Sequence, residues 1–387
     1  MKRGPTGRLE ADTHAGETVR AFVPQPLPPK PPLVIDARRQ HLLERATVAL
    51  GRLDSVSLLL PDTDLFLYAY VRREAVLSSQ IEGTQSTLDQ LLLFELNEAP
   101  GVPFDDVVEV SNYVAALEHG LARLREGFPL CNRLLREMHA VLLQRGRGSD
   151  KDPGEFRRTQ NWIGGTRPGN AHYVPPPPAR VADCMGELER FLHDEHTPYA
   201  GLVKAALAHV QFETIHPFLD GNGRIGRLLI AFILHHEGLL SRPLLYLSLY
   251  FKQHRAEYYR LLDLVRLEGD WEAWLDFFLE GVEQTAANAV GTAKRLLALF
   301  QQDAQAIERS GRSASTTLRV FQVLRERPLV TLKHVCARTG LSFPAAAKAM
   351  DNLARLGIVG EITGRKRDRV FAYRQYVAIL NEGAEPL

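Results

Sequence analysis

One short stretch of this 387-residue chain combines residue types that could bind and process a phosphate group. It runs from Ile215 to Leu228 and reads IHPFLDGNGRIGRL. Gly221 and Gly223 let the backbone turn tightly and approach a ligand closely. Because helical patterns flank the stretch, its backbone N–H groups lead into a helix N-terminus, where the helix dipole also favours an anion. The stretch is therefore predicted to be an anion-binding loop.

The side chains of this loop add groups suited to phosphate transfer. Arg224 and Arg227 are three residues apart, so they share one side of the helix and both can bind phosphate oxygens. Asp220 offers the hard oxygen that Mg²⁺ prefers, and His216 can take up a proton near pH 7. Taken singly, each is an ordinary turn residue or a solvated arginine. Together they indicate phosphate-transfer chemistry.

The loop resembles the signature of the Fic family, HxFx(D/E)GNGRxxR, which residues 216–227 match without a departure. The resemblance implies that His216 takes the proton from a target hydroxyl, that Asp220 binds Mg²⁺ and that Phe218 anchors the loop in the core. Arg224 and Arg227 are then expected to hold the β- and γ-phosphates of ATP. The full set of residues expected to contact ATP is Glu82, Asp220, Gly221, Asn222, Gly223, Arg224, Ile225, Gly226, Arg227 and Tyr259.

The same resemblance implies an activity. Fic proteins mostly transfer AMP from ATP to a Ser, Thr or Tyr hydroxyl of a protein, including themselves, and release pyrophosphate. A branch that phosphorylates instead has Lys in place of the second motif glycine, which here is Gly223. A Mg²⁺-dependent protein adenylyltransferase is therefore expected. Transfer of UMP or phosphocholine stays open, because base selectivity lies outside the motif.

A second motif, SSQIEG from Ser78 to Gly83, lies upstream of the loop. On a helix Ser78 and Glu82 would share a face, and Gly83 could simply end that helix with Glu82 in solvent. The segment also resembles the inhibitory (S/T)xxxE(G/N) motif of Fic proteins. This resemblance implies a brake in which Glu82 pairs with Arg227 and prevents productive binding of the γ-phosphate. In some relatives the glutamate also positions water, so de-AMPylation is a second implied activity.

Residues 166–178 cannot form a helix, since the turn signal at Pro168-Gly169-Asn170 is followed by a run of four prolines. They are predicted to form an exposed hairpin that resembles the target-docking flap of the family. An exposed strand edge can pair with a strand of the target. His172, Tyr173 and Val174 are then expected near the reacting groups, although a proline-stiffened surface loop explains each of them equally well.

Tyr258 and Tyr259 resemble aromatic residues that flank adenine in relatives, and they could equally belong to the core. Those relatives often carry Asn further along the same helix, where this chain has Arg266. The other histidines, including His235 and His236, lack companion carboxylates at metal-ligand spacing. They are interpreted as structural or solvated.

The elements that must position these residues are mostly helices, because apolar residues recur at three- and four-residue steps from Ile35 to about residue 285. Further on, helices at 318–325, 331–339 and 343–356 precede a two-stranded hairpin at 357–373, which is a winged-helix pattern. The predicted fold is mainly α: a Fic-type helical bundle with a short β-hairpin flap, plus a C-terminal winged helix-turn-helix domain. The predicted parts are a solvated proline-rich tail (1–32), a helical region with the inhibitory helix (33–125), the catalytic core (126–285), a connecting helix (286–312) and the winged-helix domain (313–387). The proline run that ends the tail is expected to be a stiff tether that lies on the domain, with a ligand for a proline-recognition domain as the alternative.

The winged-helix candidate carries a basic hairpin tip with Arg365, Lys366, Arg367 and Arg369. Lys348 and Arg355 add charge on the preceding helix, so the module could hold DNA phosphates. That helix is rich in alanine and poor in side chains that read bases. Packing, homodimerisation or substrate presentation are the alternatives. A DNA-binding regulator whose Fic domain senses nucleotide is thus a second hypothesis, which the presence of His216 disfavours.

Composition excludes several other classes of protein. Lys and Arg total 47 against 46 Asp and Glu, so a globally basic nucleic-acid binder is disfavoured. Cys131, Cys184 and Cys336 are too widely spaced for a disulfide framework or a standard zinc site. No apolar run could span a bilayer, and residues 1–20 do not read as a signal peptide. A cytoplasmic protein without a membrane partner is expected.

Overall fold

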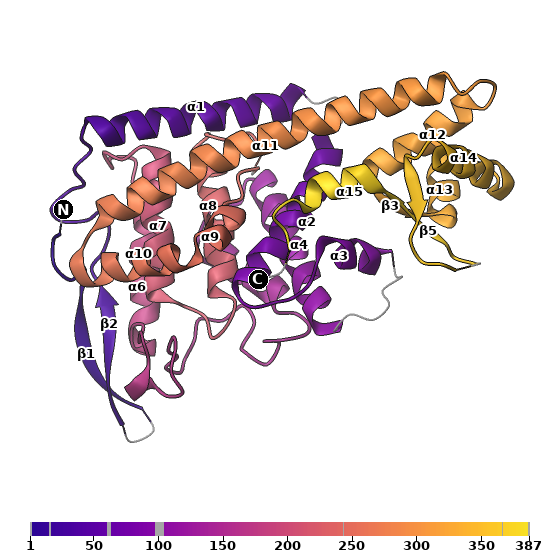
Figure 1. Cartoon of the computed structure of the whole chain (residues 1–387). Coiled ribbons are helices and arrows are strands. Elements are labelled where there is room, and N and C mark those ends of the chain that lie inside the picture. Colours follow the sequence, from indigo (N-terminus) through magenta and orange to yellow (C-terminus); the bar gives the residue numbers. More distant parts are fainter. Residues whose placement is uncertain are drawn as a thin grey trace. The chain divides into compact units, whose positions relative to one another are not determined.

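The computed structural model describes residues 2–14, 17–59, 63–96, 104–242, 244–365 and 367–385. Most of these residues are helical, as predicted (Figure 1). The chain forms two compact units, residues 1–54 with 108–286 and residues 55–107 with 287–387. In chain order, the α-helices between residues 37 and 268 are α1 (Ala37–Leu59), α2 (Thr63–Ile81), α3 (Leu88–Glu95), α4 (Phe104–Arg125), α5 (Asn132–Leu142), α6 (Pro178–Leu192), α7 (Gly201–Ile215), α8 (Asn222–His236), α9 (Ser248–Gln253) and α10 (Arg255–Glu268).

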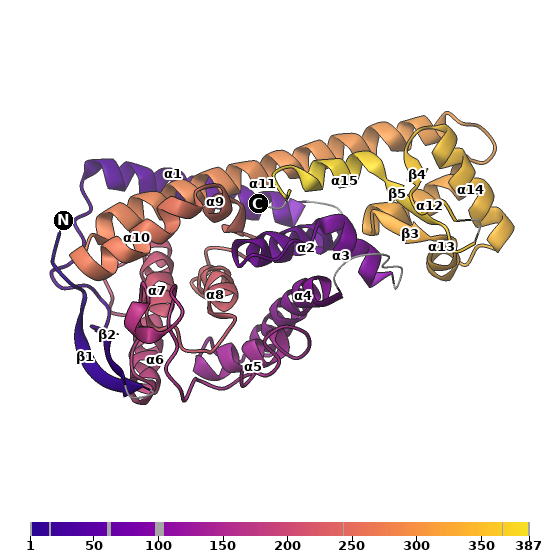
Figure 2. The ribbon, with the colours of Figure 1, turned by 60° about the horizontal axis from the view of Figure 1, so that its bottom comes forward.

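Helix α7 is the centre of the first unit, because every residue from Leu202 to Ile215 is buried. Its sequence is apolar on nearly all sides, which is typical of a helix surrounded by others. Helix α8 packs along it, and α6 and α10 flank it (Figure 2). The charged group of Lys204 on α7 is compensated by Glu237 at 2.8 Å, as a buried ammonium requires. The functional loop joins α7 to α8, so it emerges from the most buried part of this unit.

The N-terminal residues are not the solvated tail that was predicted for residues 1–32. Strands β1 (Gly7–His14) and β2 (Glu17–Pro24) form an antiparallel hairpin with Gly7 opposite Pro24. Val19 and Ala21 of β2 are buried in a cluster with Val174. The prediction was wrong because the polar and proline-rich surroundings masked a short period-two pattern, TVRAFV, that a half-buried strand needs.

The segment before β1 is also held on the first unit. Gly4 and Thr6 donate backbone hydrogen bonds to carbonyl groups at the C-terminal end of α10. Arg3 forms a 2.6 Å ion pair with Glu272 in which the two side chains are only 3% and 1% exposed. Burial raises the pKa of Glu272, but hydrogen bonds from Arg3 and from a backbone N–H outweigh burial and lower it to about 2.

Helix α11 (Trp271–Glu308) is one continuous helix of 38 residues, where a helix from Trp271 and a separate connecting helix over 286–312 were predicted. The stretch contains no proline, and alanine favours the helix throughout. Gly281 is needed within it, because a Cβ there would lie 2.7 Å from the ring of Tyr250. The two predicted helices are therefore joined without an interruption.

The end of the second unit contains the predicted helices and hairpin, together with a strand and a last helix that were not predicted. The elements are α12 (Ala314–Glu326), β3 (Leu329–Thr331), α13 (Leu332–Thr339), α14 (Phe343–Arg355), β4 (Val359–Glu361), β5 (Val370–Tyr373) and α15 (Arg374–Asn381). The strands form an antiparallel sheet in the order β3-β5-β4. Thr331 caps α13 by accepting a hydrogen bond from the N–H of His334. The predicted hairpin between 357 and 373 is thus present as β4 and β5.

Removing the buried Arg3 side chain tests whether the N-terminal segment is part of the first unit. Arg3→Ala removes the guanidinium that pairs with the buried carboxylate of Glu272, so the free energy of unfolding is expected to fall by about 3–5 kcal/mol. Arg8→Ala, which removes an exposed partner of Glu10, should cost less than about 1 kcal/mol. Chemical denaturation of both variants above pH 5, where Glu272 is ionised, measures the difference. Equal stability of Arg3→Ala and wild type would mean that the segment is a solvated tail.

Candidate active site

The loop between α7 and α8 has the backbone shape that its sequence predicts. His216 ends α7 in the left-handed region, with φ 50° and ψ 61°. Gly221 is the N-cap of α8 and also has a positive φ, 76°. A non-glycine residue at positive φ costs about 1–3 kcal/mol unless the surroundings hold it there. The strain at His216 is therefore a sign that the loop is held from outside.

The carbonyl groups of this loop are held by donors from the surrounding scaffold. The pairs are Arg157 Nε to the His216 carbonyl (2.9 Å), the Arg157 N–H to Pro217 (2.9 Å), Nδ2 of Asn161 and of Asn222 to Phe218 (2.9 and 2.8 Å) and His139 Nε2 to Asp220 (2.9 Å). In the first turn of α8, the N–H groups of Asn222 and Gly223 have no intrahelical acceptor. With its carbonyls engaged elsewhere, the loop can present these donors to an anion.

His139 supports the loop, and sequence reasoning missed this role because a single histidine on the apolar side of a helix gives no signal. It lies on α5, where its ring stacks on Phe218 with centroids 3.8 Å apart and an interplanar angle of 8°. Phe218 is fully buried, as the resemblance implied. His139 Nδ1 accepts from the N–H of Gly154 at 2.8 Å. Burial lowers the pKa of His139 to about 4, so the ring is neutral at pH 7 with its proton on Nε2.

The charged side chains of the motif lie at the start of α8. Arg224 and Arg227 are 2% and 5% exposed, so neither is the solvated arginine of a bare helix face. Arg224 donates from Nη1 to Glu109 of α4 at 2.7 Å and from Nη2 to Asp220 at 3.3 Å. Glu109 is a further residue of the site that the sequence did not indicate.

Asp220 has the chemistry of a Mg²⁺ ligand. Its Oδ1 accepts from the N–H of Gly221 at 2.6 Å, and its side chain stays 30% exposed. A Cβ on Gly148 would come within 2.8 Å of its Oδ2, so a glycine keeps the space beside this oxygen clear. Among the described residues no three His, Cys, Asp or Glu side chains cluster as metal ligands. A single carboxylate suits Mg²⁺ that is bound together with substrate phosphates.

Four other residues expected to contact ATP lie in the first turns of α8, and the structure shows what their side chains or Cα positions contact. The side chain of Asn222 is turned into the loop, where its Oδ1 accepts from the Phe218 N–H at 2.8 Å, and that of Ile225 is fully buried. Asn222 and Ile225 can therefore reach a ligand only through their backbone. At Gly226 a Cβ would lie 2.3 Å from Glu213, so this glycine serves helix packing. Gly223 is half-buried at the helix start.

The tyrosines on α10 differ in their surroundings. Tyr258 belongs to the core, because it is 1% exposed and its hydroxyl lies 2.9 Å from Nε2 of His209. Tyr259 is 40% exposed. Tyr258 is therefore a core residue. Of the two tyrosines, Tyr259 is the one whose ring a nucleotide base could reach.

The predicted flap is present, but its extended arm is not exposed. A turn of 3₁₀ helix, η1 (Pro168–Asn170), forms the tip, and Ile163 bridges Tyr173 in an antiparallel pair. Tyr173 and Val174 are each 8% exposed, because β2 lies against them and the N–H of Phe22 donates to the Val174 carbonyl at 2.9 Å. The expectation of a free edge at Val174 is therefore wrong.

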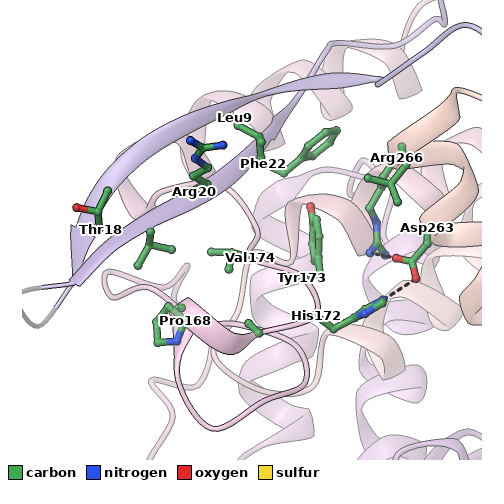
Figure 3. A pocket seen from close by; sticks show the side chains of 14 residues that line it. Leu9, Thr18, Arg20, Phe22, Pro168, His172, Tyr173, Val174, Asp263 and Arg266 are labelled. Atoms are coloured by element: carbon green, nitrogen blue, oxygen red, sulfur yellow. Dashed lines mark hydrogen bonds and ion pairs between the residues drawn. The ribbon is translucent and has the colours of Figure 1, made fainter.

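The flap, the β1–β2 hairpin and the end of α10 together line a cavity of about 440 Å³ (Figure 3). His172 is exposed and bonds Asp263 at 2.7 Å, and Asp263 also accepts from Arg266 at 3.0 Å. The guanidinium of Arg266 lies 4.0 Å from the centre of the Tyr173 ring. The hydroxyl of Tyr173 donates to the carbonyl of Thr214 at 2.7 Å, which ties the flap to the end of α7.

The second motif lies at the end of α2, in the second unit. The helix ends at Ile81, so Glu82 and Gly83 follow it instead of continuing a helical face. Gly83 has φ 99°, and the Thr84 N–H donates back to the Ser79 carbonyl at 3.2 Å. The segment thus ends α2 with a glycine at positive φ, which is the purely structural role that was considered for Gly83. Its pairing with Arg227, in the first unit, is carried by the resemblance alone.

Comparison with known proteins agrees with this geometry. Residues 129–234 match the Fic/DOC family, and residues 40–122 match the Fic/DOC family N-terminal region. Both regions are thus similar to Fic family domains. Protein adenylyltransferase Fic of Drosophila ananassae is 34% identical over 208 residues, which are 53% of this chain and 39% of that protein. The Drosophila melanogaster protein of the same name is 33% identical over the same shares. This chain spans less than half the length of these relatives.

Solved structures share the fold. A Fic family protein from Desulfovibrio desulfuricans G20 has a TM-score of 0.58 at 22% identity, covering 89% of this chain and 98% of its own. Fic-1 of C. elegans, residues 134–508, has a TM-score of 0.52 at 24% identity, covering 66% of this chain and 72% of its own. In the part of the chain that the structure describes, none of the helices has the length and hydrophobicity of a membrane-spanning helix.

The neutral state of His139 predicts a pH dependence of stability. In the unfolded chain this ring protonates near pH 6.5, whereas in the folded chain it stays neutral down to about pH 4. The folded state therefore loses stability as the pH falls through that window, by up to about 3 kcal/mol. Thermal unfolding between pH 7.5 and 4.5 should show a steeper decline for wild type than for His139→Phe. Parallel profiles would contradict the assignment.

Proposed function

We propose that this chain is a protein adenylyltransferase that transfers AMP from ATP to a Ser, Thr or Tyr hydroxyl of a protein target, including itself. The observation that carries the proposal is the α7–α8 loop. His216 is held in a strained turn directly before a glycine-capped helix start, and the loop carbonyls are engaged from behind. Relatives named protein adenylyltransferase, which match 53% of this chain, support the same reaction.

The reaction assigns a task to each group of the loop. His216 takes the proton of the target hydroxyl while the hydroxyl oxygen attacks the α-phosphorus of ATP. The new O–P bond forms as the bond to pyrophosphate breaks, and the proton remains on His216. N–H groups at the start of α8, with Arg224 and Arg227, hold the phosphates. Asp220 is the residue to bind Mg²⁺, which when bound supplies positive charge beside the phosphate oxygens.

Glu82 is proposed to restrain this activity by pairing with Arg227, which then cannot hold the γ-phosphate. The support is the match of Ser78, Glu82 and Gly83 to the inhibitory motif of the family. Water positioned by the same glutamate would also make the chain a de-AMPylating enzyme. The widely spaced cysteines support a cytoplasmic setting for both reactions.

The C-terminal elements favour a second candidate function. The order α12-β3-α13-α14-β4-β5, with its three-stranded sheet, supports the assignment of a winged-helix domain. Lys348 and Arg355 of α14 are exposed, as are Arg365 and Arg367 of the hairpin tip, while Lys366 lies outside the described residues. These exposed charges could hold DNA phosphates, so the alternative proposal is a DNA-binding regulator with a nucleotide-sensing Fic domain. The presence of His216 favours the enzyme, because sensing needs no base.

Replacement of His216 tests the proposed reaction. His216→Ala should bind ATP like wild type and lose about 10²–10⁴-fold in transfer, since only the proton acceptor is removed. Incubation with α-labelled ATP and, in parallel, α-labelled UTP measures both the rate and the choice of nucleotide. His236→Ala, at the other end of α8, is the matched control and should transfer normally. Undiminished labelling by His216→Ala would refute the role, and label from UTP alone would assign the other nucleotide.

Replacement of Glu82 tests the brake. Glu82→Gly should raise transfer and self-modification by about tenfold or more, for which a change of about 1.4 kcal/mol in the barrier suffices. Glu82→Gln keeps the size and removes the charge, so it should show most of the same increase. The double variant Glu82→Gly with His216→Ala gives the background. Rates equal to wild type in both single variants would remove the brake from the proposal.

A further inference from the structure

Glu109 is a buried carboxylate that pairs with an arginine of the catalytic motif. It lies on α4 within the first unit and is 3% exposed. Its Oε1 accepts from Arg224 Nη1 at 2.7 Å. Removing one member of such a buried pair is strongly destabilising, because the other is left charged and uncompensated. The position of Arg224 is therefore firmly tied to Glu109.

Because Arg224 contacts both Glu109 and Asp220, the position of Arg224 also restricts the orientation of the Asp220 carboxylate. A guanidinium is planar, so fixing Nη1 on Glu109 also fixes the direction of Nη2. Nη2 lies 3.3 Å from Oδ1 of Asp220, and this oxygen also accepts from the N–H of Gly221. Donors on both sides thus hold Oδ1. The other carboxylate oxygen, Oδ2, faces the space that Gly148 keeps clear.

The charges of this chain of contacts matter for a cation. If Arg224 paired with Asp220 alone, the positive charge of the guanidinium would offset the negative charge of the Asp220 carboxylate. It would also repel Mg²⁺ at this carboxylate. With Glu109 present, the guanidinium stands between two carboxylates, so Glu109 offsets the positive charge that Arg224 would otherwise place beside Asp220. Groups that orient a ligand and adjust its charge from behind typically change metal affinity by about 10–100-fold.

We propose that Glu109 is a positioning residue that offsets the charge of Arg224 and thereby keeps Asp220 oriented, with its negative charge available for Mg²⁺. This inference rests on the proposed function only in taking the ligand to be Mg²⁺ with ATP. It adds a residue from α4, more than a hundred positions before the motif, to the set that prepares the site.

Calorimetric titration of ATP into the full chain at a series of Mg²⁺ concentrations tests the inference without requiring transfer. Glu109→Gln keeps the shape and removes the charge, so the half-saturating Mg²⁺ concentration should rise by about tenfold or more. Binding of Mn²⁺ followed by electron paramagnetic resonance should weaken by a similar factor. Glu109→Asp retains the charge at shorter reach and should lie between wild type and Glu109→Gln.

The matched control is Glu272→Gln. Glu272 is also a buried glutamate paired with an arginine of the first unit, but it pairs with Arg3. Both Gln variants should lose thermal stability, and only Glu109→Gln should shift the Mg²⁺ dependence. An unshifted dependence in folded Glu109→Gln or Glu109→Asp overturns the inference, as does an equal shift in Glu272→Gln. A wild type that binds ATP with Mg²⁺ and labels no protein overturns the proposed reaction alone.

Discussion

The site depends on one constraint: the carbonyl groups of the loop between α7 and α8 must be satisfied from behind. Arg157, Asn161 and His139 come from segments far from the loop in sequence, and each donates to a loop carbonyl. A loop that followed α7 freely would leave these carbonyls to water and relax the strained turn at His216. Because they are held, the donors at the start of α8 stay available for an anion.

Buried charges around the loop follow the same logic. Burial of a charge without compensation would be too costly, so Arg157 donates to backbone carbonyls and other buried charges pair with groups of opposite sign. Arg224 has Glu109 and Asp220, and Lys204 on the neighbouring helix has Glu237. His139 avoids the problem by staying neutral, which its bonds to Gly154 and Asp220 require. His139 thus supports the loop without adding a charge beside the phosphate that the loop is proposed to bind.

The N-terminal hairpin changes how the flap is understood. The flap has the turn and the bridge of a hairpin, but β2 already donates to it at Val174 and covers Tyr173. On the far side, His172 and Arg266 converge on Asp263 at the edge of a cavity (Figure 3). A protein that approaches this face therefore meets the chain's own first residues beside the flap.

The sequence by itself determined the local features: the helical character, the turn at Gly221, a loop that leads into a helix and the hairpin of the C-terminal elements. Each depends on residues close together in the chain, through periodicity, capping or glycine torsion angles. It also indicated His216, Asp220, Arg224 and Arg227, which lie within one motif.

Only the tertiary structure decided which distant residues complete the site and which predicted ones turn inward. Glu109, His139 and Arg157 reach the loop from three separate segments, and no spacing in the sequence marks them. The side chains of Asn222 and Ile225 are buried, and the first residues form strands against the flap where a tail was predicted. The physical reason is that burial and pairing of polar groups are properties of packed neighbours, which a pattern along one chain does not contain.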